Sequence, residues 1–178
     1  INKVKSPIGK QDQYATAIGG FNVLNFKKDS TVIVKKIKKE KIIKEIFDNS
    51  VLIWVGGSRK ANKILKDQNS RLKINKEKLN LIRKFAVNLE SMIKKNYFSI
   101  KDFGNLINKS WNLKKNLSKK IVNNRITKIY NFAIENGSLG GKLLGAGGGG
   151  FLYMVVKKKD IMRFKKKINL YDKKIRFM

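Results

Sequence analysis

Apolar residues along this chain follow a strand-like spacing near the start, a helical spacing in the middle and a strand-like spacing again near the end. Segments 21–26 and 31–37 are rich in β-branched and aromatic residues and are separated by the polar stretch Lys-Lys-Asp-Ser, which predicts a β-hairpin. The run 50–55 (SVLIWV) is almost uniformly apolar and is followed by Gly56-Gly57. It predicts a buried strand.

Helical spacing dominates the middle of the chain. The pattern predicts helices at 58–70, 75–96, 99–116 and 119–136. The second of these carries one continuous apolar stripe, formed by Leu79, Ile82, Phe85, Ala86, Leu89, Met92 and Ile93. Asn136-Gly137 predicts the end of the last helix, because glycine accepts the left-handed conformation that commonly follows a helix C-terminus.

The last forty residues return to strands. Residues 142–156 predict a strand, a glycine-rich loop and a second strand, followed by a short basic helix near 159–169 and a final strand at 173–178. The order strand, helices, strand, strand, helix, strand is typical of a split β-α-β sheet with helices on one face. We therefore predict an α+β fold with a ferredoxin-like sheet.

Composition narrows the possible chemistry. The 178 residues suffice for one domain, or for one domain and part of another, and they include neither cysteine nor histidine. Acid–base chemistry therefore falls to Asp, Glu, Lys or Tyr. The sequence contains neither an apolar run of roughly 18 residues nor a signal-peptide pattern, which predicts a soluble, cytoplasmic protein.

The formal charge of +30 suggests a polyanion as partner. However, 36 of the basic residues are Lys and 6 are Arg, whereas recognition of base edges and phosphates favours the planar fork of Arg. The lysines are spread along the chain beside abundant Ile and Asn, a combination that an A- and T-rich genome also produces. A basic polyanion-binding module remains an alternative interpretation.

Glycines interrupt the apolar run KLLGAGGGGFLYMVV at 142–156. Gly145, Gly147 and Gly150 satisfy G-x-G-x-x-G, but a dinucleotide-binding turn of this type opens a helix, and here a strand follows. The triplet Asp102-Phe103-Gly104 lies before the glycine loop and within a helical pattern, which excludes a protein-kinase arrangement. Two interpretations stay open: a loop in close backbone contact with its neighbours, and a cradle of N–H groups for anionic oxygens.

Four stretches together resemble the C-terminal portion of sugar kinases of the GHMP superfamily, and most of all the D-glycero-D-manno-heptose-7-phosphate kinase branch. They are GKQDQYATAIGGFN (9–22), VGGSRKANKIL (55–65), INKSWNLKKNL (107–117) and NFAIENGSLGGKLLGAGGGGF (131–151). The resemblance implies that residues 1–40 are the C-terminal end of the family's N-terminal domain and that residues 45–178 form its C-terminal domain.

The same resemblance implies a missing part. The family's phosphate-binding loop, of the P-x-x-x-G-L-G-S-S type, has no counterpart between Ile1 and Met178. We therefore expect the chain to be a partial one that has no kinase activity alone. ATP and Mg2+ are the implied cofactors, with their principal ligands in the missing N-terminal part and no metal ligands in this chain.

The resemblance also implies roles for individual residues. Asp12 matches the catalytic aspartate, and Gly9 and Lys10 precede it at a predicted helix start, where the helix dipole and the Lys charge favour an ionised carboxylate. A capping role for Asp12 is the alternative. Ser58 and Arg59 are the candidate ligands of the acceptor's own phosphate, although Arg59 also fits a solvated first turn of a helix.

The glycine-rich motif, implied to border the active site, is Gly145, Ala146, Gly147, Gly148 and Gly149. Side chains there are expected to block the sugar and phosphate cleft. The role of Lys142, just before the motif, stays open between substrate contact and solvation. Trp54 and Trp111 lie on apolar stretches and are interpreted as core residues.

The function implied is ATP-dependent phosphorylation of the anomeric hydroxyl of D-glycero-D-manno-heptose 7-phosphate, for nucleotide-heptose and polysaccharide biosynthesis. The expected partners are the sugar phosphate and ATP, with no membrane and no specific nucleic acid. A kinase of the same superfamily acting on fucose or galactose is the first alternative, and the polyanion-binding module is the second.

Overall fold

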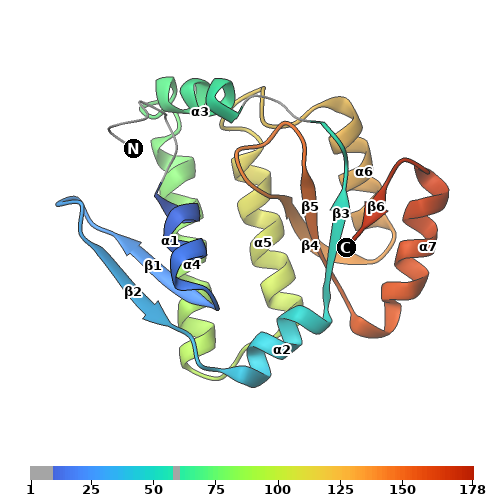
Figure 1. Ribbon diagram of the computed structural model, residues 1–178, viewed down its shortest axis with the longest axis horizontal. Helices are drawn as coiled ribbons and strands as arrows, with labels where there is room; N and C mark the ends of the chain where they lie inside the picture. Colours follow the sequence, from blue (N-terminus) through green and yellow to red (C-terminus); the bar gives the residue numbers. More distant parts are fainter. Residues whose placement is uncertain (1–9, 58–60) are drawn as a thin grey trace.

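The computed structural model describes residues 10–57 and 61–178, which build two separate antiparallel sheets and the helices around them (Figure 1). In chain order the elements are α1 (Gln11–Ile18), β1 (Asn22–Phe26), β2 (Val32–Lys36), α2 (Glu40–Asp48), β3 (Ser50–Trp54), α3 (Ala61–Ser70), α4 (Lys76–Lys94), α5 (Ile100–Lys114), α6 (Asn124–Glu135), β4 (Ser138–Leu143), β5 (Phe151–Val156), the 3-10 turn η1 (Lys158–Asp160), α7 (Ile161–Tyr171) and β6 (Arg176–Phe177).

The larger sheet has the strand order β4-β5-β3-β6 and is antiparallel throughout. β5 lies between β3 and β4, and β3 lies between β5 and β6, so each pair of strands joined through helices is split by a third strand. Leu52 of β3 faces Tyr153 of β5, and Lys142 of β4 faces Tyr153 from the other side. This arrangement confirms the predicted α+β fold with a split β-α-β sheet.

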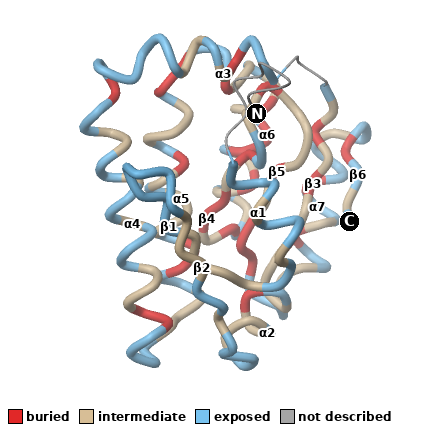
Figure 2. The backbone as a smooth tube through the Cα atoms, turned by 60° about the vertical axis from the view of Figure 1, so that its left-hand side comes forward, coloured by how far each residue is buried: buried red, intermediate tan, exposed pale blue. Residues whose placement is uncertain are grey.

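One face of this sheet forms the main core. Val51 and Ile53 of β3 alternate with half-buried residues, as a strand covered on one face does. They cluster with Ile129 of α6 and with Phe164 and Ile168 of α7. Figure 2 shows the buried segments gathered around these strands, whereas α1 and the β1–β2 hairpin are exposed or half-buried.

Helix α5 lies unusually close to β4. A Cβ atom on Gly140 would overlap the carbonyl oxygen of Gly104, and a Cβ on Gly104 would lie 2.7 Å from that of Leu139. The hydroxyl oxygen of Tyr130, in α6, lies 2.7 Å from Asn108 Oδ1 and 3.1 Å from the Gly141 carbonyl oxygen, so two acceptors share its single proton. Glycine within α5, normally unfavourable by about 1 kcal/mol, is therefore required by this approach.

The hairpin β1–β2 packs beside α4 and α2 (Figure 1). Lys35 of β2 forms an ion pair with Glu90 of α4 at 3.3 Å, and Phe21 meets Phe47 of α2 edge to face. These contacts attach the first forty residues to the helices that follow. The domain boundary between residues 40 and 45 stays a prediction.

Several predicted elements need correction. Helix α6 begins at Asn124 instead of residue 119, because the Asn123 side chain accepts the Ile126 N–H at 2.9 Å and caps the helix there. The strand before the glycine loop begins at Ser138, four residues earlier than predicted, and the final strand contains only Arg176 and Phe177. Helix α2 was not predicted at all.

Candidate functional site

The glycine-rich loop joins β4 to β5 and is held by backbone hydrogen bonds to two other segments. The Gly148 N–H donates to the Ile121 carbonyl at 2.7 Å, and the Gly150 N–H donates to the Gly56 carbonyl at 3.1 Å. At its start, the Leu144 N–H donates to the Phe151 carbonyl at 2.9 Å. The N–H groups of Gly148 and Gly150 therefore serve the loop's own packing.

Two of the glycines are required by close backbone packing. A Cβ on Gly147 would lie 2.8 Å from the Ile121 carbonyl oxygen, and a Cβ on Gly149 would overlap the carbonyl oxygen of Gly57. A Cβ on Gly145, in contrast, would meet no atom within 4 Å. Side chains in this motif were expected to block the sugar and phosphate cleft; at Gly147 and Gly149 an added Cβ would already meet the chain's own backbone, and the cleft stays a prediction.

The segment under the loop is fixed by α3. Asp67 accepts a hydrogen bond from the buried Ser118 hydroxyl at 2.5 Å and pairs with Lys120 at 3.1 Å, which holds the stretch that contains Ile121. Gln68 donates to the Ala146 carbonyl at 3.3 Å, a direct contact between α3 and the glycine loop. Helix α3 thus supports the loop in two places.

The turn Gly56-Gly57 is fixed from the opposite direction. Arg125, in α6, donates to the Val55 carbonyl and forms an ion pair with Asp172 at 2.7 Å. The guanidinium therefore ties the end of β3, and with it the turn that contacts the glycine loop, to the segment after α7.

Asp12 lies in the first turn of α1 and is exposed. Lys10 precedes the helix, is also exposed, and accepts the Tyr14 N–H on its carbonyl at 3.1 Å. Gly9, Ser58 and Arg59 lie outside the described residues. Their predicted substrate contacts, and the catalytic role of Asp12, stay predictions.

The charge of Asp12 influences two half-buried lysines near the glycine loop. Lys114, the last residue of α5, donates from Nζ to the Gly145 carbonyl at 2.7 Å. Burial, together with the neighbouring charge of Lys142, lowers the pKa of Lys114 to about 8, and the carboxylate of Asp12 opposes this change. Burial also lowers the pKa of Lys142, again opposed by Asp12.

The three charged groups thus come from α1, α5 and β4 and act on one another. Among the residues that the structure describes, Asp12 forms no ion pair within 4.0 Å. The sequence left the role of Lys142 open and did not single out Lys114. The only signal for Lys114 was its place in the stretch 107–117.

Part of the chain matches a known protein family. Residues 88–170 match the family described as GHMP kinases C terminal. This part of the chain is therefore similar to the C-terminal domain of GHMP kinases. The chain is 36% identical, over 83% of its length, to D-glycero-alpha-D-manno-heptose 7-phosphate kinase of Campylobacter jejuni, and it spans 44% of that protein.

The chain is also similar to other proteins. L-fucokinase/L-fucose-1-P guanylyltransferase of Bacteroides fragilis is 31% identical over 84% of the chain, which spans 16% of that protein. The structure of a D-glycero-D-manno-heptose 1-phosphate kinase from Bacteroides thetaiotaomicron superposes with a TM-score of 0.62, at 24% identity, over 91% of this chain and 42% of its own. The chain therefore spans less than half the length of these relatives.

The two tryptophans of the chain have different surroundings. Trp111 is 2% exposed and belongs to the core, as predicted. Trp54 is half-buried on the opposite face of the sheet, where its ring meets that of Phe151 at a centroid distance of 4.8 Å. The core interpretation is thus confirmed for Trp111 and incomplete for Trp54.

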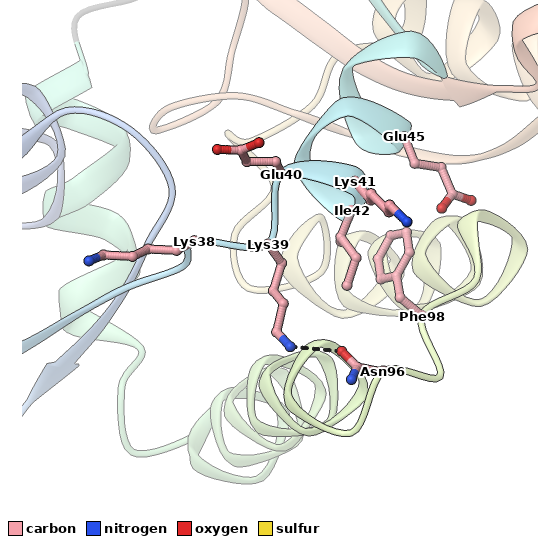
Figure 3. A pocket seen from close by; sticks show the side chains of 8 residues that line it. All are labelled: Lys38, Lys39, Glu40, Lys41, Ile42, Glu45, Asn96 and Phe98. Carbon is pink, nitrogen blue, oxygen red and sulfur yellow. Dashed lines mark hydrogen bonds between the residues drawn. The ribbon is translucent and has the colours of Figure 1, made fainter.

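A surface hollow elsewhere in the molecule does not belong to this site. It lies at the start of α2, where Lys39 donates to Asn96 Oδ1 at 2.8 Å and Ile42 lies near Phe98 (Figure 3). Helix α2 precedes β3, whereas the glycine loop lies beyond the other end of β3 (Figure 1). The charged side chains around the hollow belong to the junction between the first forty residues and the sheet domain.

Within residues 10–57 and 61–178, no three His, Cys, Asp or Glu side chains are grouped so that they could hold a metal ion. None of the described helices combines the length and apolar character needed to cross a bilayer.

Proposed function

We propose that this chain is part of an ATP-dependent sugar kinase that phosphorylates the anomeric hydroxyl of D-glycero-D-manno-heptose 7-phosphate in the cytoplasm. The acceptor is suggested by the 36% identity to the Campylobacter jejuni enzyme of that name. ATP supplies the phosphoryl group, and the magnesium that accompanies it takes its ligands outside the described residues.

The observation that carries the proposal is the 36% identity to the Campylobacter jejuni kinase over 83% of the chain. Beside the glycine loop, the Lys114 ammonium contacts the Gly145 carbonyl, and the charge of Asp12 acts on Lys114 and Lys142. Phosphoryl transfer needs an oriented acceptor hydroxyl, a place for its proton and positive charge near the phosphoryl oxygens. In the proposed reaction, the Asp12 carboxylate accepts a hydrogen bond from the acceptor hydroxyl, orients it and receives its proton late in the transfer. The lysines supply the positive charge.

A kinase acting on fucose is the second candidate, favoured by the 31% identity to the Bacteroides fragilis enzyme. The two candidates differ in the acceptor, since only the heptose carries a phosphate before the reaction. Parallel assays of the complete enzyme with both sugars decide between them: a higher kcat/KM for unphosphorylated fucose would overturn the heptose assignment.

The test of Asp12 is the substitution Asp12→Asn in the complete enzyme. It preserves shape and removes the proton acceptor, so kcat should fall by about 10²-fold or more, with a small change in KM. Asp102→Asn is the matched control, because Asp102 is likewise exposed in the first turn of a helix. An equal, small effect of both substitutions would leave Asp12 with a helix-terminal role only.

A further inference from the structure

The two lysines beside Asp12 present an unbalanced cluster of charge. Lysine side chains ordinarily lie at the surface with the ammonium group in water. In a chain with a net charge of +30, two lysines held close together also repel each other. Lys114 and Lys142 are instead half-buried on neighbouring elements: the Lys114 ammonium contacts the carbonyl of Gly145, three residues after Lys142, and the charge of Lys142 helps to lower the pKa of Lys114. Asp12 offers a single negative charge to both.

Some other partly buried charges, among them Asp67, Arg125 and Asp172, have a partner of opposite sign. Lys120 and Arg71 both contact Asp67, and Arg125 contacts Asp172 at 2.7 Å. In contrast, the described residues provide no carboxylate within 4.0 Å of either Lys114 or Lys142. Like charges held together at reduced hydration, without a paired anion, are unfavourable unless a ligand compensates them.

The donors of the two ammonium groups are also largely unused. A lysine ammonium has three N–H donors. Lys114 directs one to the Gly145 carbonyl, and Lys142 donates to no described residue. Because the two side chains come from α5 and β4, they can contact different oxygens of one anion.

We propose that Lys114 and Lys142 together bind a phosphate monoester dianion next to Asp12. Its two charges match the two ammonium groups, and its several terminal oxygens match their free donors through charge-assisted hydrogen bonds. The phosphate comes either from the nucleotide or from the sugar acceptor. The identity of this ligand rests on the sugar-kinase function proposed above, whereas the phosphate site itself does not.

The site is tested directly with inorganic phosphate, at constant ionic strength and pH 7, by following the lysine side-chain NMR signals of the 178-residue chain. Saturable shifts of the Lys114 and Lys142 signals are expected. Lys114→Gln and Lys142→Gln should each weaken phosphate binding by about 10-fold or more, as expected for one lost charged hydrogen bond. The control Lys109→Gln, at an exposed position of the same helix, should bind as the unmodified chain does.

Two further measurements keep the result interpretable. Thermal unfolding of each variant reports whether it folds, and Lys142→Arg, which keeps the charge, should retain most of the binding that Lys142→Gln loses. Unmoved Lys114 and Lys142 signals, or equal binding by the two Gln variants and the Lys109→Gln control, would overturn the phosphate site.

Kinetics of the complete enzyme identify the source of the phosphate. A KM for the sugar phosphate raised about 10-fold by Lys114→Gln or Lys142→Gln assigns the site to the acceptor, whereas a lowered kcat or a raised KM for ATP assigns it to the nucleotide. Unchanged kcat and KM values overturn the site's role in the reaction. Absence of any sugar phosphorylation would refute the proposed function instead, and the phosphate titration would still decide the site.

Discussion

Gly147→Ala should destabilise the domain strongly, whereas Gly145→Ala should not. Both glycines have a positive φ, 110° for Gly147 and 67° for Gly145, so either alanine carries backbone strain of about 1 kcal/mol or more. Only at Gly147 does the new Cβ also approach the Ile121 backbone, at 2.8 Å from its oxygen and 2.9 Å from its Cα. Neither atom can move without displacing the segment that Asp67 and Ser118 hold.

The difference between the two variants follows from this geometry. Overpacking costs about 1–3 kcal/mol, so Gly147→Ala should lower the free energy of unfolding by about 2–5 kcal/mol in total. Each kcal/mol corresponds to about 2–4 °C in Tm for a chain of this length. The gap between the two variants should therefore be about 2–12 °C.

Urea unfolding monitored by circular dichroism, together with the Tm, measures both variants under the same conditions. The slope of the free energy of unfolding against urea should be unchanged, because the buried surface is the same. If Gly147→Ala is no less stable than Gly145→Ala, the close packing of the loop against Ile121 is wrong, and the glycine at 147 must serve another purpose.

Two further predictions concern charge and helix ends. Lys114 should titrate near pH 8 by NMR. Lys142→Met, which removes a positive neighbour, should raise the pKa of Lys114, and Asp12→Asn, which removes a negative one, should lower it. A pKa change in the opposite direction for either variant would contradict the charge cluster. Asn123→Ala should reduce the free energy of unfolding by about 1 kcal/mol through loss of the α6 cap, and Asn123→Ser, which can still cap, should restore most of it; equal stability of all three proteins would refute this role.

Much of the fold was predictable because its signals are local. The hairpin, the strand at 50–55 and the helices α4 and α5 follow from residue types and apolar spacing. The start of α6 was misplaced because residues 119–123 continue a helix-compatible pattern, and the break depends on the Asn123 cap and on the Ser118 contact with Asp67. The latter is made by a residue 51 positions away in the sequence.

Some residues of the candidate site were likewise predictable from the sequence, and others were not. Asp12 and the glycine loop stand out as motifs in the sequence, whereas Lys114 is one of 36 lysines with no local mark. Its half-buried position arises from the close approach of α5 to β4, which depends on Gly104 and Gly140. No single segment contains that information.

The glycine loop serves the site through its rigidity. It is held from three directions: by Gln68 of α3, by the Ile121 carbonyl, and by the Gly56 turn that Arg125 and Asp172 fix. A loop held in this way presents the Gly145 carbonyl at a defined place, and that carbonyl receives the Lys114 ammonium at 2.7 Å. The glycines of the loop therefore act indirectly. Their lack of side chains permits the close packing that fixes the Gly145 carbonyl, and this carbonyl in turn positions the Lys114 ammonium, on which the charge of Asp12 acts.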